Sequence, residues 1–169
     1  DTARALWTKV REAALTQNAA RSAAGSLRGF ALDEAFADWH RVRTEHCLFA
    51  FSPALADSNL QVFADAHEKA WQHLTDYFDG APPWSVRYVV WDSNDEARRL
   101  ADIQSLGFAK PEACLVHCRW DQTVGHELTH VVSYQALKPG ARTALINEGL
   151  AVCFDLTGRD RPATARQAV

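Results

Sequence analysis

The chain of 169 residues has no methionine, few cysteines and no long hydrophobic run, and each shortage narrows what the protein can be. Because Met is absent even at position 1 and no signal peptide is present, we expect a processed mature protein or an excised domain. The longest apolar run, Cys47 to Ala56, contains Ser52 and Pro53 and is too short for a membrane span. A net charge of −3 does not indicate a general nucleic-acid binder.

Four cysteines are too few to define a disulfide scaffold. They are compatible with two disulfides in an exported protein and equally with four buried thiols, and we favour a secreted or periplasmic location. If residues 114–118 form a strand, Cys114 and Cys118 lie roughly 13 Å apart and cannot bond each other. Two disulfides would then have to join that strand to Cys47 and Cys153.

The residues that are present, 47% hydrophobic and 23% charged, are typical of one globular domain. Their periodicity predicts an α+β fold, with a small mixed or antiparallel sheet and N-terminal helices. We assign residues 1–43 to a helical lid, brace or prosegment, 44–157 to the main domain and 158–169 to a polar tail. Helices are expected at 3–23, 54–78, 122–137 and 143–156, with a short one ending near 103, strands at 43–51, 84–91 and 112–120, and a loop at 107–111.

The most informative stretch is His126-Glu127-Leu128-Thr129-His130, which matches the pattern H-E-x-x-H. On a helix, both imidazoles point the same way and can hold one zinc ion, while Glu127 can reach a water on that metal. The apolar residues of the expected helix cluster on a different face. A helix that is buried for packing alone has no use for two imidazoles and a carboxylate. We therefore expect one face of this helix to form a metal site.

A third ligand is available eighteen residues after His130, at Glu148 on the next expected helix. A turn at Pro139-Gly140 allows that helix to return antiparallel and bring Glu148 beside the histidines. Catalytic zinc commonly takes three protein ligands and leaves a fourth position for water. The predicted function is zinc-dependent peptide-bond hydrolysis, in which Glu127 activates the zinc-bound water as a general base.

The HELTH stretch followed by Asn147-Glu148-Gly149-Leu150-Ala151 resembles the gluzincin metallopeptidases. It is closest to the minimal peptidase domain that they share with the zinc aminopeptidases, in which an acidic residue, here Asp155, follows the glutamate ligand. The resemblance implies one zinc ion on His126, His130 and Glu148, with Glu127 as the base. It also implies that residues 112–120 form an edge strand, packed on the active-site helix and the glutamate helix. Substrate would then pair with this strand through Leu115, Val116 and His117.

The chain departs from this family in three places. Val152 stands where the thermolysin-like branch has an Asp that orients a zinc-binding histidine. Asp155 is the candidate for a supporting role behind the metal ligands, and the residue it would contact is open. The G-x-M-E-N motif of the aminopeptidases is missing from 107–118, so we expect an endopeptidase acting on a peptide or protein substrate. No tyrosine follows Tyr134, which leaves Tyr134 and His117 as candidates to stabilise the oxyanion.

Two other interpretations stay open. Cys114, Cys118, His126 and His130 could form a structural zinc site, although its middle spacer is short and Glu127 and Glu148 would have no role. The chain could also be a pseudopeptidase, which binds peptides without cutting them.

Overall fold

The computed structural model describes residues 2–13, 16–30, 34–56, 59–137 and 143–156. A mixed sheet in the order β1-β2-β3-β5-β4 forms its centre, as the predicted α+β fold requires. The inner pairs β2–β3 and β3–β5 are parallel, while the outer strands β1 and β4 are antiparallel to their neighbours. The strands are β1 (His40–Arg43), β2 (Cys47–Phe51), β3 (Val86–Trp91), β4 (Gly107–Lys110) and β5 (Leu115–Arg119).

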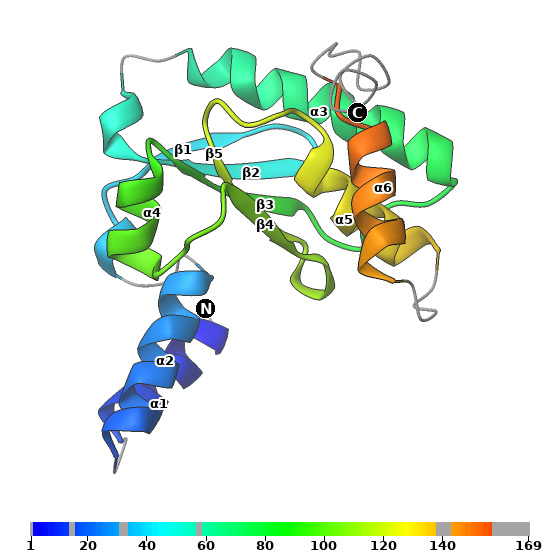
Figure 1. Cartoon of the computed structure of the whole chain (residues 1–169). Coiled ribbons are helices and arrows are strands. Elements are labelled where there is room, and N and C mark those ends of the chain that lie inside the picture. The colour runs from blue at the N-terminus through cyan, green and yellow to red at the C-terminus, as the bar shows by residue number, and fades with distance from the viewer. Residues whose placement is uncertain (1, 14–15, 31–33, 57–58, 138–142, 157–169) are drawn as a thin grey trace, which may run out of the picture.

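Helices cover both faces of this sheet, and an N-terminal helical hairpin projects from one end of it (Figure 1). No helix among the described residues is long and apolar enough to cross a membrane. The α-helices are α1 (Thr2–Glu12), α2 (Gln17–Gly29), α3 (Leu60–Phe78), α4 (Asn94–Ala101), α5 (His126–Ala136) and α6 (Ala144–Cys153). Three short 3₁₀ helices are η1 (Glu34–Phe36), η2 (Pro53–Leu55) and η3 (Pro111–Ala113).

The core has two parts, one on each face of the sheet. Successive residues of a strand point to opposite faces, so Tyr88 and Val90 of β3 face α3 and α5, while Val89 and Trp91 face η1 and α4. Both faces of the central strands are therefore buried, which explains why β2, β3 and β5 are almost continuously apolar. Helix α5, which contains the HELTH stretch, packs on the first of these faces.

The predicted edge strand is wrong. Residues 115–119 form β5, which lies between β3 and β4, and the outer position belongs to Gly107–Lys110, expected to be a loop. Those four residues carry a glycine and stand before a proline, and they become a strand because β5 offers its free edge for pairing. The expected helix 3–23 is two helices, and the second of them, α2, continues to Gly29.

The N-terminal segment reaches the sheet at two places. Strand β1 belongs to residues assigned to this segment, yet it pairs with β2 as part of the sheet. The buried His117 donates a hydrogen bond of 2.7 Å from Nε2 to the carbonyl oxygen of Gly29, which ends α2. No described residue of α1 or α2 lines the pocket at the histidines. The assignment of residues 1–43 to a lid, brace or prosegment stays a prediction. The predicted tail 158–169 lies outside the described residues.

Candidate metal centre

Helix α5 begins at the first histidine of the motif, four residues later than expected. Gly125 precedes it with a φ of 98°, a conformation that side chains with a Cβ rarely adopt. A Cβ at Gly125 would lie 2.4 Å from the carbonyl oxygen of Phe154, at the end of α6. The amide of Leu156 also donates to the carbonyl of Val124 at 2.9 Å. The start of α5 and the end of α6 are thus held in contact by backbone atoms.

The three predicted ligands meet between these helices. Glu148 places one carboxylate oxygen 3.4 Å from His126 Nε2 and the other 3.5 Å from His130 Nε2. Zinc bound tetrahedrally by nitrogen and oxygen at about 2.1 Å has ligand atoms roughly 3.4 Å apart. The two imidazoles and the carboxylate therefore match the donor types and the spacing that zinc prefers. His126, His130 and Glu148 could hold one such ion.

Glu127 lies behind these ligands in a different environment. It is 8% exposed, whereas the side chain of Glu148 is 61% exposed. Burial raises the pKa of Glu127 to about 7, with a further contribution from the charge of Glu148. Gln122 Nε2 donates a hydrogen bond of 2.8 Å to Glu127 Oε1, and this bond lowers the pKa of Glu127. Burial also lowers the pKa of His130, which favours the neutral imidazole that binds metal.

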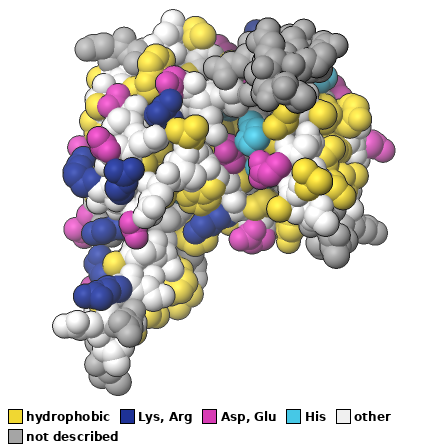
Figure 2. Space-filling view, viewed as in Figure 1, with side chains coloured by type: hydrophobic (Ala, Val, Ile, Leu, Met, Phe, Trp, Pro, Cys, Tyr) yellow, Lys and Arg dark blue, Asp and Glu magenta, His cyan; other side chains and the backbone are white. Residues whose placement is uncertain are grey.

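A pocket of about 520 Å³ opens over the ligands. One wall is the outer strand β4 with Gly107, Phe108 and Ala109, and the others come from α5 and the beginning of α6. Tyr134, two turns after His126 on α5, also lines it. On this face, histidine side chains lie beside acidic ones with hydrophobic surface around them (Figure 2).

The other predicted substrate residues do not reach this pocket. Leu115, Val116 and His117 are fully buried in β5, so their assignment to substrate binding is wrong. His117 stacks between Phe108 and Trp91 in the core and is therefore no candidate for the oxyanion. The prediction was wrong because one more strand, β4, pairs with the outer side of β5. Asp155 is buried directly after α6, and its predicted supporting role stays a prediction.

The structural zinc alternative is not formed. His126 and His130 group with Glu148, and neither Cys114 nor Cys118 joins them. All four cysteines are free thiols, which agrees with the alternative without disulfides, although Cys153 is exposed rather than buried. A second group with ligand-type atoms, Glu45, His46 and Glu68, lies near the turn between β1 and β2. There Glu68 accepts hydrogen bonds from Thr44 and His46, which closes the turn onto α3.

Gln122 is the site residue that sequence reasoning missed. Besides its bond to Glu127, it lies against Gly107, where an added Cβ would meet its Oε1 at 2.2 Å. No motif marks Gln122, because its position depends on the turn between β5 and α5 and on the neighbouring edge strand. Comparisons with protein-family models, with curated proteins and with solved structures return no match to this chain.

Proposed function

We propose that the protein is a zinc-dependent peptidase with His126, His130 and Glu148 as metal ligands. The observation that carries the proposal is the convergence of these three side chains at zinc-like spacing, with the buried Glu127 on the same turn of α5. The resemblance of the two motifs to the gluzincins supports the same function. The cavity, in turn, provides room for a substrate at the ligands.

Zinc held there would polarise a substrate carbonyl and lower the pKa of a coordinated water toward neutrality. The residues of this chain supply the remaining steps. Glu127 accepts a proton as the nucleophile attacks, and then delivers it to the leaving amine. A pKa near 7 suits both roles, because the group must gain and lose a proton in each cycle. Gln122 holds the carboxylate at its Oε1 and leaves Oε2 for the reaction.

The substrate of this proposal is an extended peptide on the outer edge of β4. One edge of β4 pairs with β5, and residues of β4 line the pocket at the metal ligands. An open strand edge can form backbone hydrogen bonds with a peptide of any sequence. This replaces residues 115–117 with 107–109 as the substrate strand. Tyr134 is the tyrosine of the pocket, and we assign its hydroxyl to the oxyanion that forms on the cleaved carbonyl.

The test compares zinc content and cleavage of a peptide library in the wild type and in Glu127→Gln. We expect one bound zinc ion in both proteins and cleavage that falls by about 100-fold to 10,000-fold in the variant, because the general base is lost. Glu112→Gln is the matched control, since Glu112 is an exposed glutamate on η3 outside the pocket lining. His126→Ala should lose the zinc itself.

The same experiment separates the pseudopeptidase from the enzyme. Zinc binding by the wild type without any cleavage of the library would favour a protein that only binds peptides. Equal cleavage by wild type and Glu127→Gln would refute the assigned base, and full zinc retention by His126→Ala would refute the metal site.

A further inference from the structure

A second cavity lies on the opposite face of the sheet from α3 and α5. It has a volume of about 240 Å³, and three arginines from three different elements line it: Arg4 of α1, Arg41 of β1 and Arg87 of β3. Two aromatic side chains, Phe30 and Phe36, form part of its wall. We call this cavity the arginine pocket. No acidic side chain of the described residues lines it.

The strand register explains why two of the arginines meet on this face. Arg41 pairs with Ala50, and Ala50 pairs with Val89, so the three residues share one side of the sheet. Ala50 and Val89 belong to the core beneath η1 and α4. Arg87 precedes Val89 by two positions and faces the same way.

Arg87 is an unusual residue for its position. It lies on the central strand β3 and is half-buried, with its guanidinium carbon 5.9 Å from the centre of the Phe30 ring. Arg41 donates one hydrogen bond of 2.8 Å to the carbonyl of Phe36. Within the described part of the chain, neither arginine forms an ion pair. Burial lowers the pKa of both side chains.

Arg41 lies on the exposed side of the cavity, whereas the Arg87 guanidinium is partly withdrawn from water and has no acidic side chain among the described lining residues. A charge in that position destabilises the fold unless something else compensates it. Each guanidinium also has five N–H donors in a planar fork, which matches the oxygens of phosphate and carboxylate groups. The aromatic wall favours a flat apolar body beside that charge. A cavity of this volume is small for a ligand site, which favours a molecule with a single ring.

We propose that the arginine pocket binds a small organic anion, whose phosphate or carboxylate group pairs with Arg41 and Arg87 and whose apolar body packs on Phe30. Because Arg4 belongs to α1, such a ligand would also connect the helical hairpin to the sheet. The metal ligands lie across the sheet on α5 and α6, so this site is independent of the proposed peptidase activity.

The experiment uses three probes of similar shape on the whole chain: phenyl phosphate, benzoate and neutral phenol. Binding is measured by calorimetry, and the unfolding midpoint is followed at constant ionic strength. We expect phenyl phosphate or benzoate to bind and raise the midpoint while phenol does not. The stronger of the two anions identifies the charged group as phosphate or carboxylate.

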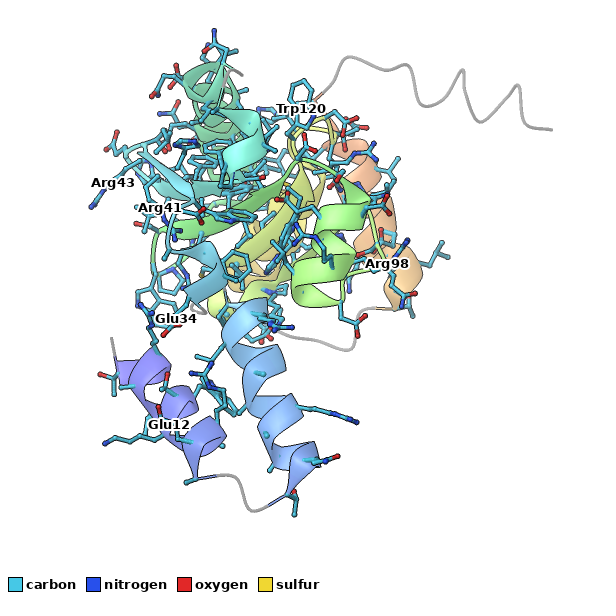
Figure 3. All side chains as sticks on the ribbon, turned by 90° about the vertical axis from the view of Figure 1, so that its left-hand side faces the viewer. Glu12, Glu34, Arg41, Arg43, Arg98 and Trp120 are labelled. Carbon is cyan, nitrogen blue, oxygen red and sulfur yellow. The ribbon has the colours of Figure 1, made fainter. Side chains whose placement is uncertain are left out.

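Three variants assign the binding to the pocket. Arg41→Gln and Arg87→Met should each raise the Kd of the bound anion by about tenfold or more, because a charge-assisted hydrogen bond is lost. Arg43→Gln is the matched control and should leave the Kd of the anion unchanged. Arg43 lies on β1, like Arg41, but its side chain points outward (Figure 3). Without ligand, Arg87→Met should unfold no earlier than the wild type, since it removes a half-buried charge that forms no ion pair with any residue the structure describes.

The proposal is overturned if neither anion binds, if phenol protects as well as the anions do, or if Arg43→Gln weakens binding as much as the pocket variants. An Arg87→Met protein that unfolds earlier without ligand, together with unchanged anion binding in Arg41→Gln, would also overturn it. That last combination of results would show that Arg41 and Arg87 stabilise the fold and do not bind a ligand.

Discussion

At the scale of single residues, the candidate centre depends on two glutamates in contrasting surroundings. Glu148 is mostly exposed and lies within 3.5 Å of both imidazoles, as a metal ligand requires. Glu127 is buried, and its pKa is raised to about 7, as a group that exchanges protons near neutral pH requires. Their difference in burial is what the proposed roles of metal ligand and general base need, and the order of the two residues in the motif does not show it.

Gln122 provides the sharpest test of this arrangement. Gln122→Met keeps the side-chain volume but removes the 2.8 Å hydrogen bond to Glu127. The loss of this bond disfavours the ionised carboxylate of Glu127. We expect kcat to fall by roughly tenfold or more with zinc content unchanged. The ionised form of Glu127 is the base, so cleavage rises with pH through its pKa. Because the lost bond had lowered that pKa, the acidic limb of the profile should move to higher pH.

The control for this prediction is Gln61→Met on α3. Gln61 also donates to a carboxylate at 2.8 Å, that of Asp65, but it lies on the exposed surface away from the pocket. It should leave kcat and the pH profile unchanged. An unshifted pH profile in Gln122→Met, with normal kcat, would show that Gln122 does not position Glu127.

At the scale of elements, the ligands depend on how α5 meets α6. Helix α6 is largely exposed and buries only Ala151, so its contact with α5 determines where Glu148 lies. That contact includes the close approach of Gly125 to the carbonyl of Phe154. Two glycines near the ligands therefore have opposite roles, because Gly125 is required by its backbone conformation and Gly149 has open space around it.

Replacing each of these glycines with alanine should separate the two roles. Gly125→Ala should destabilise the fold by about 1–3 kcal/mol and weaken zinc binding, because a positive φ and a 2.4 Å contact force the two helices apart. Gly149→Ala should stabilise the protein by up to about 1 kcal/mol, because alanine favours the helix interior. Urea unfolding and zinc competition measure both effects. Tight zinc binding by a stable Gly125→Ala protein would contradict the assigned helix contact.

The elements also show what the sequence can predict. The periodicity of α3 and the apolar run of β3 are local signals, and both elements form close to where they were expected. The strand β4 has no such signal, since Gly107 and Pro111 are typical of a loop and its pairing with β5 is decided by distant residues. The same limit applies to the sheet order and to Gln122. The motif predicted which side chains could bind metal. The wall of the pocket could not be predicted in this way, because it depends on the pairing of β4 with β5.

At the scale of the whole molecule, β4 connects the two proposed sites. Its first residue, Gly107, lies against Gln122 at the candidate metal centre. Its last, Lys110, places its ammonium 4.6 Å from the centre of the Phe30 ring in the wall of the arginine pocket. The hydrogen bond from His117 to Gly29 ties the neighbouring strand to the hairpin. The strand β4 thus contacts both the candidate metal centre and the end of the N-terminal helical hairpin.

The labelling rates of the cysteine thiols measure the stability of the folded chain as a whole. Cys47, Cys114 and Cys118 are buried, whereas Cys153 is exposed on α6, so one thiol per native chain should react quickly. In Cys153→Ser, the remaining three should react with a disulfide reagent only when the protein opens. Zinc that binds only the native fold at about 100 times its Kd stabilises it by about 2.7 kcal/mol. Labelling through global opening should then slow about 100-fold.

Because thiolates themselves bind zinc, the decisive comparison is Cys153→Ser with and without His126→Ala. Zinc at the candidate centre should protect the buried thiols only while His126 is present, since that side chain supplies one of the three ligands. Equal protection in both proteins would place the zinc on the cysteines of the opened chain. If zinc does not change the labelling rate of either protein, the folded protein has no metal centre at α5 and α6.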